Sequence, residues 1–329
     1  MIKRLTERGI FPFFLVLLIA LLIRVPALFY LPKIESLLKT GMLYDSVAWV
    51  NQWPVISLLL ALLIVIVQAF FLNEICRNHG LVNPLGYLPA YFFIIVQSLY
   101  PENLLLSEYH LGNLLVFIGL SCFLQLKDGY SRVILFYGSL AFGVVVLIVP
   151  DHLMILLFIL ASVLVFKNIM VLDVLCILFG LVMPFCIVRS LAFIFNWGLT
   201  SIDQVLTTPI NIQVFRDGIG IVIEKYALFL FLLLCILLGL FKQIGNYFQN
   251  NVEVRRSKLV VILFFTYSVL LMLLHWRELR SFHLLSAFPA AVFLSSFYTG
   301  NRIPWWKELL NLAIVLAVLY SLYGSFLVL

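Results

Sequence analysis

Residues 54–72 read PVISLLLALLIVIVQAFFL, an apolar run without a charged side chain. A helix needs about 20 such residues to cross the hydrocarbon core of a bilayer. The rest of the chain has the same character, because 64% of its 329 residues are hydrophobic and 11% are charged, with a mean hydropathy of +1.15. Soluble domains carry roughly 45–50% apolar and about 25% charged residues. The composition therefore excludes a soluble enzyme, a secreted disulfide scaffold, a disordered tail and a nucleic-acid-binding protein, and predicts a polytopic membrane protein.

The run at 54–72 is one of eleven, so the sequence predicts an all-α fold: a single transmembrane helical bundle over residues 1–329, with about eleven spans. The basic N-terminus MIKRLTERGI precedes the first run, which continues to about Leu31 without a small-residue cleavage site. This pattern indicates an uncleaved first span and not a signal peptide. The spans are expected near residues 11–31, 54–72, 85–100, 111–126, 133–149, 153–166, 169–195, 226–241, 259–274, 284–298 and 309–327.

The distribution of charge predicts the orientation. If the N-terminus lies inside and the spans alternate, thirteen of the 21 Lys and Arg fall in inside loops, six fall in outside loops, and two, Arg24 and Arg189, fall within spans. Cytoplasmic loops carry the excess of Lys and Arg, so the N-terminus is expected inside and the C-terminus outside. Nine of the fifteen acidic residues and four of the five histidines then face outward. Any chemistry is therefore expected on the outward face.

Two longer connections, 32–53 and 196–225, mix apolar and polar residues and carry a Trp near a boundary. Each is expected on the outward side, either as a helix in the headgroup plane or as a plain loop. The five cysteines form no CxxC pair and no zinc spacing. They are expected to act as small apolar residues of the core.

The two arginines within spans are the first candidate binding residues. Arg24 and Arg189 lie six or seven residues before the outer ends of their spans, at a depth of about 10 Å given a rise of about 1.5 Å per residue. An arginine at that depth costs a few kcal/mol unless it pairs or snorkels to the surface. Either both point into an outward cavity and bind a phosphate, or both reach the outer headgroups.

Two further polar clusters lie on the outward side. The stretch at 98–113 places Glu108 and His110 at the membrane edge, where one of them could serve as a base or metal ligand or simply end a helix. The stretch HWRELRSFH at 275–283 contains Arg277 and Arg280, which share one face of a helix. Such a pair suits a diphosphate or a lipid phosphate; the alternative is an interfacial loop that touches anionic headgroups.

General catalytic and transport signatures are absent from the sequence. It contains no Gly-rich phosphate loop, no HExxH and no GxSxG. The spans lack the regular carboxylates of an ion-coupled pump, and no repeat of the kind found in many transporters is apparent. Motifs of this type therefore assign no function.

Several stretches resemble the GT-C superfamily of polytopic glycosyltransferases. They are LLIRVPALF at 21–29, LYDSVAWV at 43–50, SLYPENLLLSEYHLGNLLVFIGLSCFLQL at 98–126, and the Arg-rich stretch before HLLSAFPAAVFL at 283–294. The resemblance implies an outward site that uses a polyprenyl-phosphate-linked sugar, and it leaves a divalent metal open as a cofactor. It also implies Asp45, or less readily Glu35, as the base that activates the acceptor, with Glu108 or His110 assisting. The arginines at 24, 277, 280 and 189 would then lie near the donor phosphates.

The chain also resembles a family of Bacteroidota inner-membrane proteins of similar length. The matching stretches are the N-terminal run, FFLNEICRNHGLVNPLGYLPAYFFIIVQSLYPE at 70–102, and the turn Lys127-Asp128-Gly129. This resemblance implies a bacterial inner membrane, with the N-terminus cytoplasmic and the C-terminus periplasmic. Membrane lipids, polyprenyl-phosphate among them, are the expected partners, and nucleic acid is not. The chain lacks the paired Asp and Glu of the GT-C loop, so a non-catalytic subunit of an envelope or secretion complex and a lipid or solute transporter stay as alternatives.

Overall fold

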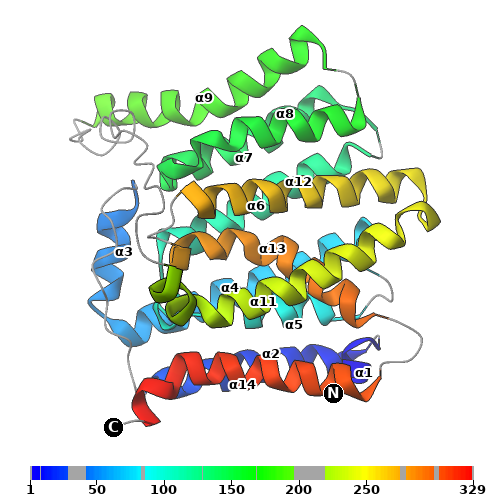
Figure 1. Ribbon diagram of the computed structural model, residues 1–329. Helices are drawn as coiled ribbons and strands as arrows, with labels where there is room; N and C mark the ends of the chain where they lie inside the picture. Colours follow the sequence, from blue (N-terminus) through cyan, green and yellow to red (C-terminus); the bar gives the residue numbers. More distant parts are fainter. Residues whose placement is uncertain are drawn as a thin grey trace.

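The computed structural model describes residues 2–7, 9–28, 42–82, 86–127, 129–167, 169–195, 219–274, 279–299 and 304–327. Within these ranges every regular element is an α-helix or a short 3-10 helix, and none is a strand. Most of the long helices run along a common direction and stack in layers (Figure 1). The predicted all-α class is therefore confirmed.

The helices follow one another with short turns over most of the described chain. Two of them are interrupted by proline, Pro184 in α9 and Pro289 in α13. The α-helices are α1 (Ile2–Leu5), α2 (Ile10–Arg24), α3 (Tyr44–Asn51), α4 (Pro54–Asn78), α5 (Leu88–Gln97), α6 (Glu108–Gln125), α7 (Arg132–Ile148), α8 (Ile155–Phe166), α9 (Val171–Ile194), α11 (Ile219–Gly245), α12 (Val252–Leu274), α13 (Leu279–Tyr298) and α14 (Trp305–Leu327). The 3-10 helices are η1 (Val25–Leu28), η2 (Pro101–Leu104), η3 (Pro150–Met154) and η4 (Tyr247–Gln249).

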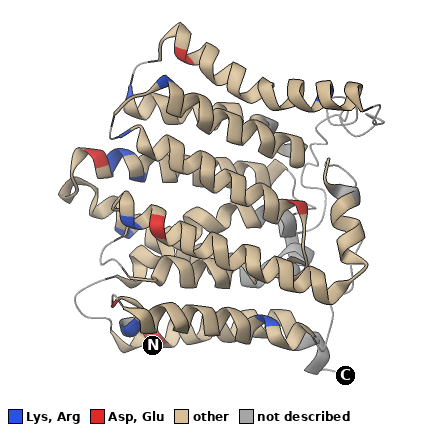
Figure 2. Ribbon diagram, turned by 180° about the vertical axis from the view of Figure 1, so that it is seen from behind, with Lys and Arg blue, Asp and Glu red and all other residues tan. Residues whose placement is uncertain are grey.

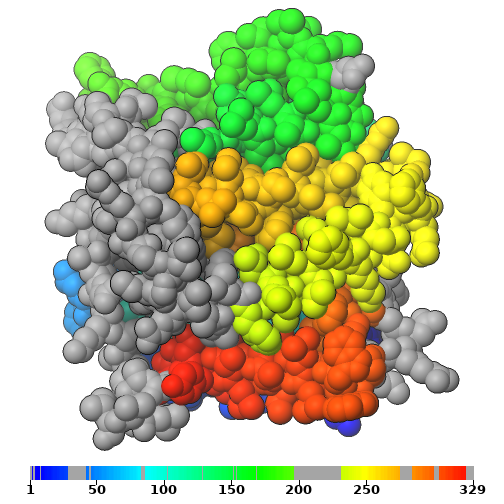
Figure 3. Space-filling view, in the orientation of Figure 1, coloured from blue at the N-terminus to red at the C-terminus, as the bar shows by residue number. Residues whose placement is uncertain are grey.

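The layers run from α9 at one edge of the bundle to the pair of α2 and α14 at the other (Figure 1). Helix α9 packs on α7, α7 packs on α6, and α12 packs on both α8 and α13. Helix α13 also packs on α5 and α11, and α11, α12 and α14 form one face of the molecule (Figure 3). Helix α5 lies at the centre, because all ten of its side chains are buried. The short α5 is therefore a core element and not a lipid-facing one.

The described helices fit a membrane protein. Five shorter apolar helices of 10–17 residues accompany five that are long and apolar enough to cross a bilayer. The count of about eleven spans and a GT-C-like arrangement go beyond these helices and stay predictions. The five long ones cover Ile10–Leu28, Pro54–Asn78, Val171–Ile194, Val252–Leu274 and Trp305–Tyr323.

Close backbone contact holds α7 and α9 together. A Cβ atom added at Gly143 would lie 2.6 Å from the carbonyl oxygen of Leu181, and one added at Gly180 would lie 2.8 Å from that of Phe136. Both distances are shorter than a carbon and an oxygen tolerate. Small residues at such crossings are typical of helices that associate within a membrane.

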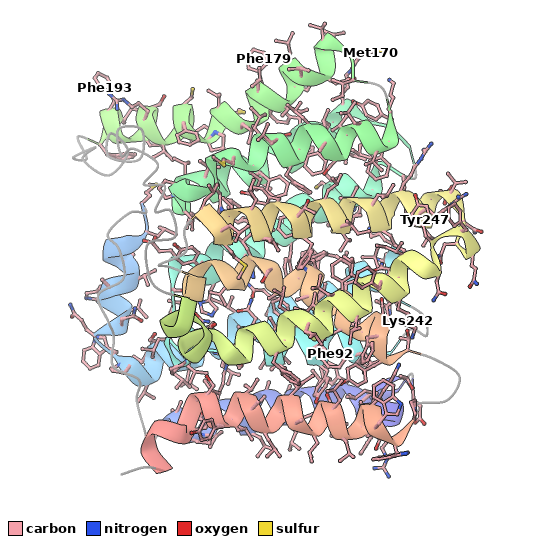
Figure 4. The ribbon with its side chains drawn as sticks, viewed as in Figure 1. Phe92, Met170, Phe179, Phe193, Lys242 and Tyr247 are labelled. Carbon is pink, nitrogen blue, oxygen red and sulfur yellow. The ribbon has the colours of Figure 1, made fainter. Side chains whose placement is uncertain are left out.

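The outer surface of the bundle is as apolar as its core. Phe179 and Phe193 on α9 are 68% and 82% exposed, whereas Phe92 on α5 is fully buried (Figure 4). A surface of exposed Leu, Ile, Val and Phe on this scale is unfavourable in water. It suits hydrocarbon, which agrees with the composition.

Cationic side chains gather at one end of the bundle, which we call the basic end; the other is the far end. Figure 2 shows most of the blue residues near helix termini on one side. Figure 1 places the chain's N-terminus at the basic end and its C-terminus at the far end. Arg24 is the last residue of α2, and Arg189 lies near the end of α9, so both belong to the far parts of their helices. The described cations near the helix termini of the basic end are Arg4, Arg77, Lys127, Arg132, Lys167, Lys242, Arg255, Arg256, Lys258 and Lys307.

The two predicted surface segments are described in part. In the segment 32–53, residues 44–51 form α3, which lies across the far ends of the long helices (Figure 1). In the segment 196–225, helix α11 begins at Ile219 and therefore includes residues that we expected to precede the span. Residues 196–218 lie outside the described part of the chain.

Candidate functional site

An irregular segment at the far end carries the most concentrated set of buried polar groups. We call residues 98–107, between α5 and α6, the polar connection. Helix α5 ends at Gln97, and Pro101 opens the short helix η2, since its ring fixes φ and it lacks an N–H. Tyr100, Leu105 and Ser107 then adopt extended backbone angles. Apart from η2 the connection is non-helical, yet most of its described side chains are buried, so its backbone groups need partners within the protein.

The partners come from helices that are distant in sequence. Asn51 at the end of α3 donates from Nδ2 to the carbonyl of Leu106 (3.1 Å). Ser57 on α4 accepts from the Leu106 N–H (2.8 Å) and donates to Asn51 Oδ1 (2.5 Å). Both backbone groups of Leu106 are therefore hydrogen-bonded to the side chains of Asn51 and Ser57, which also bind each other.

Three more hydrogen bonds extend this pattern. Ser321 on α14 donates to the Leu99 carbonyl (3.0 Å), and Gln68 on α4 donates from Nε2 to the carbonyl of His110 in the first turn of α6 (2.6 Å). Arg24 on α2 donates from Nη1 to the Leu104 carbonyl at a long 3.4 Å. The connection is therefore held by α2, α3, α4 and α14 together.

Arg24 stands apart from the other donors because its hydrogen-bonding capacity is mostly unused. The side chain is fully buried. Its Nε and Nη2 have no hydrogen-bond partner among the described residues, and no described carboxylate forms an ion pair with it. A buried guanidinium with one long hydrogen bond is costly, since charged groups in apolar surroundings are normally paired. The arrangement leaves a cation that an anion would stabilise.

Glu108 and His110 open helix α6 next to the connection. Glu108 is 8% exposed, and His110 is fully buried. The Nδ1 atom of His110 lies 2.7 Å from Ser107 Oγ, at hydrogen-bond distance. Arg24 contacts the backbone at Leu104, four residues before Glu108 and six residues before His110.

The other predicted site residues are placed less fully. Asp45 lies on α3 at the far end, and Arg280 lies in the first turn of α13, but the side chains of both lie outside the described part. Arg277 lies outside it altogether. The start of α13 is tied to α6, because Asn113 donates to the Leu284 carbonyl (2.9 Å).

Arg189 is separated from this group. It is exposed on α9, at the opposite edge of the layers from α2 (Figure 1). Within the described chain, no three His, Cys, Asp or Glu residues gather in a way that would hold a metal ion. The described geometry therefore offers an anion site around Arg24 and no metal centre.

Sequence reasoning missed the side chains that hold the connection. Gln68 interrupts an otherwise apolar run and is fully buried. A lone amide inside a span is a usable signal, since polar residues there normally hydrogen-bond across helices. Asn51 and Ser57 carry no such signal, because they lie at a helix end, where polar residues are ordinary.

Comparisons with protein-family models, with curated proteins and with solved structures gave no match. The resemblances described above therefore rest on the quoted stretches of sequence alone.

Proposed function

We propose that this protein is an integral protein of a bacterial inner membrane that binds a lipid-linked phosphate at the far end, as a GT-C-like glycosyltransferase using a polyprenyl-phosphate-linked sugar would. The basic end is then cytoplasmic and the far end periplasmic, by the excess of Lys and Arg in cytoplasmic loops. The expected number of spans is eleven, and Bacteroidota are the expected source.

The observation that carries the proposal is the state of Arg24. Its guanidinium is fully buried, and two of its nitrogens have no partner among the described residues. A planar guanidinium binds phosphate through two parallel hydrogen bonds. A phosphate bound there would supply both the missing charge and the missing acceptors.

The neighbouring residues support a reaction and not binding alone. Glu108 and His110 begin α6 beside the segment that Arg24 contacts. In the proposed transfer, Asp45 removes the proton of an acceptor hydroxyl, that oxygen attacks the sugar's anomeric carbon, and the polyprenyl phosphate leaves with the bonding electron pair. Arg24, with Arg277 and Arg280, stabilises the charge of that leaving phosphate.

The experiment is a transfer assay with the full chain in lipid vesicles that contain a polyprenyl-phosphate sugar. We expect Arg24→Gln and Asp45→Asn to lower turnover by about a hundredfold or more, as for other residues that stabilise a developing charge or act as the base. Arg256→Gln, an exposed arginine at the basic end, is the matched control and should keep full turnover. Unchanged turnover in both test variants would refute the proposal.

A further inference from the structure

A cavity of about 520 Å³ opens at the basic end, far from the polar connection. It lies between the last turns of α4 and α6 and the first turn of α7. Its wall is apolar at Phe71 and Ile134 and polar at Glu74, Asn78 and Gln125. A bound water occupies about 30 Å³, so the cavity has room for a group much larger than one ion.

Two helix C-termini and Glu74 favour a positive charge in the cavity, and the first turn of α7 at Ile134 offsets only part of this effect. Helix α4 ends there with Gly80 at a positive φ of 61°, and the Leu81 N–H reaches back to the Cys76 carbonyl (3.1 Å). This is the usual glycine-terminated helix end. Helix α6 also ends beside the cavity, and helix C-termini carry partial negative charge. The carboxylate of Glu74 adds a full negative charge on the wall.

Two cations contact residues that line the same cavity. Arg77 Nη2 is 2.6 Å from Glu74 Oε1, and Lys127 Nζ donates to the Asn78 carbonyl (3.1 Å). The Glu74–Arg77 pair is exposed, with side chains 44% and 59% accessible. An exposed pair one helical turn apart is weak. A ligand cation can therefore take the place of Arg77 on Glu74 and leave the guanidinium available for an anion.

We propose that this cavity binds the headgroup of an amine-bearing phospholipid. The ammonium group binds Glu74 at the two helix ends, and the adjacent phosphate binds Arg77 and Lys127. The apolar side chains of Phe71 and Ile134 in the wall suit the start of the acyl chains. A primary amine fits better than a trimethylammonium group because it donates hydrogen bonds to the carboxylate.

This proposal does not depend on the proposed transferase, because it concerns the opposite end of the bundle and none of the transferase residues. It also distinguishes between lipids. A purely anionic headgroup that binds Arg77 and Lys127 would leave Glu74 without a cation, whereas a zwitterion with its amine and phosphate side by side complements the carboxylate and both cations.

The test uses the purified full chain in detergent and measures lipid binding by native mass spectrometry. Phosphatidylethanolamine, phosphatidylcholine, phosphatidylglycerol and soluble phosphoethanolamine are the probes. We expect phosphatidylethanolamine to bind about tenfold more tightly than the other lipids, and Glu74→Gln to remove most of that preference, since it deletes a charge-assisted hydrogen bond. Glu253→Gln, at the same end on α12, is the control and should keep the preference.

A second variant fills the cavity without disturbing the fold. Gly129 lines the cavity, and a Cβ atom added there meets no other atom within 4 Å. We expect Gly129→Leu to lower the affinity for phosphatidylethanolamine about tenfold, since the added side chain occupies the ligand's space. Gly245→Leu, where an added Cβ also meets open space, should leave binding unchanged.

Equal binding of phosphatidylethanolamine and phosphatidylglycerol would overturn the proposal. So would full binding in Glu74→Gln and Gly129→Leu together. If soluble phosphoethanolamine bound as tightly as the lipid, the site would serve a free metabolite and the lipid assignment would be wrong. Weak binding of the soluble probe supports the lipid assignment.

Discussion

The two ends of the bundle handle their polar groups in opposite ways. At the far end, Asn51, Ser57 and Gln68 are buried and bind backbone groups of the polar connection and of the first turn of α6. At the basic end, Glu74 and Arg77 form an exposed pair beside an open cavity. A buried hydrogen bond is expensive to remove because the abandoned partner cannot reach water, whereas an exposed one is replaced by solvent at little cost. Substitution of these polar residues should therefore lower the free energy of unfolding strongly at the far end and little at the basic end.

The largest effect is expected from Ser57→Ala. The change removes the acceptor of the Leu106 N–H and the donor to Asn51 Oδ1. With two buried groups left unpaired, the free energy of unfolding should fall by about 3 kcal/mol, as measured by equilibrium unfolding in a denaturing detergent. Ser190→Ala, an exposed serine that bonds only within α9, should change it by less than about 0.5 kcal/mol. Equal effects would contradict the difference between buried and exposed polar groups on which the contrast rests.

A smaller loss is expected from Gln68→Leu. Its side chain donates to the His110 carbonyl at 2.6 Å, and the replacement leaves that buried carbonyl without this donor. Leucine offsets part of the cost through its apolar surface, so we expect a loss of about 1–2 kcal/mol in the same measurement. A stability equal to that of the wild type would mean that the hydrogen bond from Gln68 on α4 does not stabilise the first turn of α6.

The smallest effect is expected at the basic end. Arg77→Ala breaks the ion pair with Glu74, whose partners are 59% and 44% exposed. The free energy of unfolding should change by less than about 0.5 kcal/mol. A loss comparable to that of Ser57→Ala would show that the rim of the cavity is a structural element, and the contrast between the two ends would be wrong.

Composition and the apolar runs predicted the fold class, because helices with surfaces this apolar are stable in a bilayer and not in water. Arg24 and the start of α6 lie toward the same end of the bundle, as expected from the sequence, whereas a common site of Arg24, Glu108 and His110 stays a prediction. The separation of Arg189 was not predictable. Depth in a span follows from sequence position, but lateral neighbours depend on how helices pack, and the layers place α9 and α2 at opposite edges.

The brace of the polar connection was also beyond sequence reasoning. The carbonyl that accepts a hydrogen bond from Asn51 lies in the polar connection, and no periodicity predicts the path of such an irregular segment. The carbonyl that accepts from Gln68 depends on how α4 and α6 pack. The length of α5 was missed for a related reason. Residues 85–100 read as one apolar run, yet the helix covers only Leu88–Gln97, because the bundle buries an irregular segment where a longer helix was expected.

The central claim is that Arg24 binds an anion and contributes little to the stability of the fold. The most direct measurement compares wild type and Arg24→Met for unfolding free energy without ligand and for binding of polyprenyl phosphate. A buried guanidinium whose Nε and Nη2 are unpaired among the described residues stabilises little, so replacement by an apolar side chain of similar length should leave stability unchanged or raise it. Binding should fall by about tenfold or more. A loss of several kcal/mol in stability with unchanged binding would contradict the account and make Arg24 a structural brace of the Leu104 carbonyl.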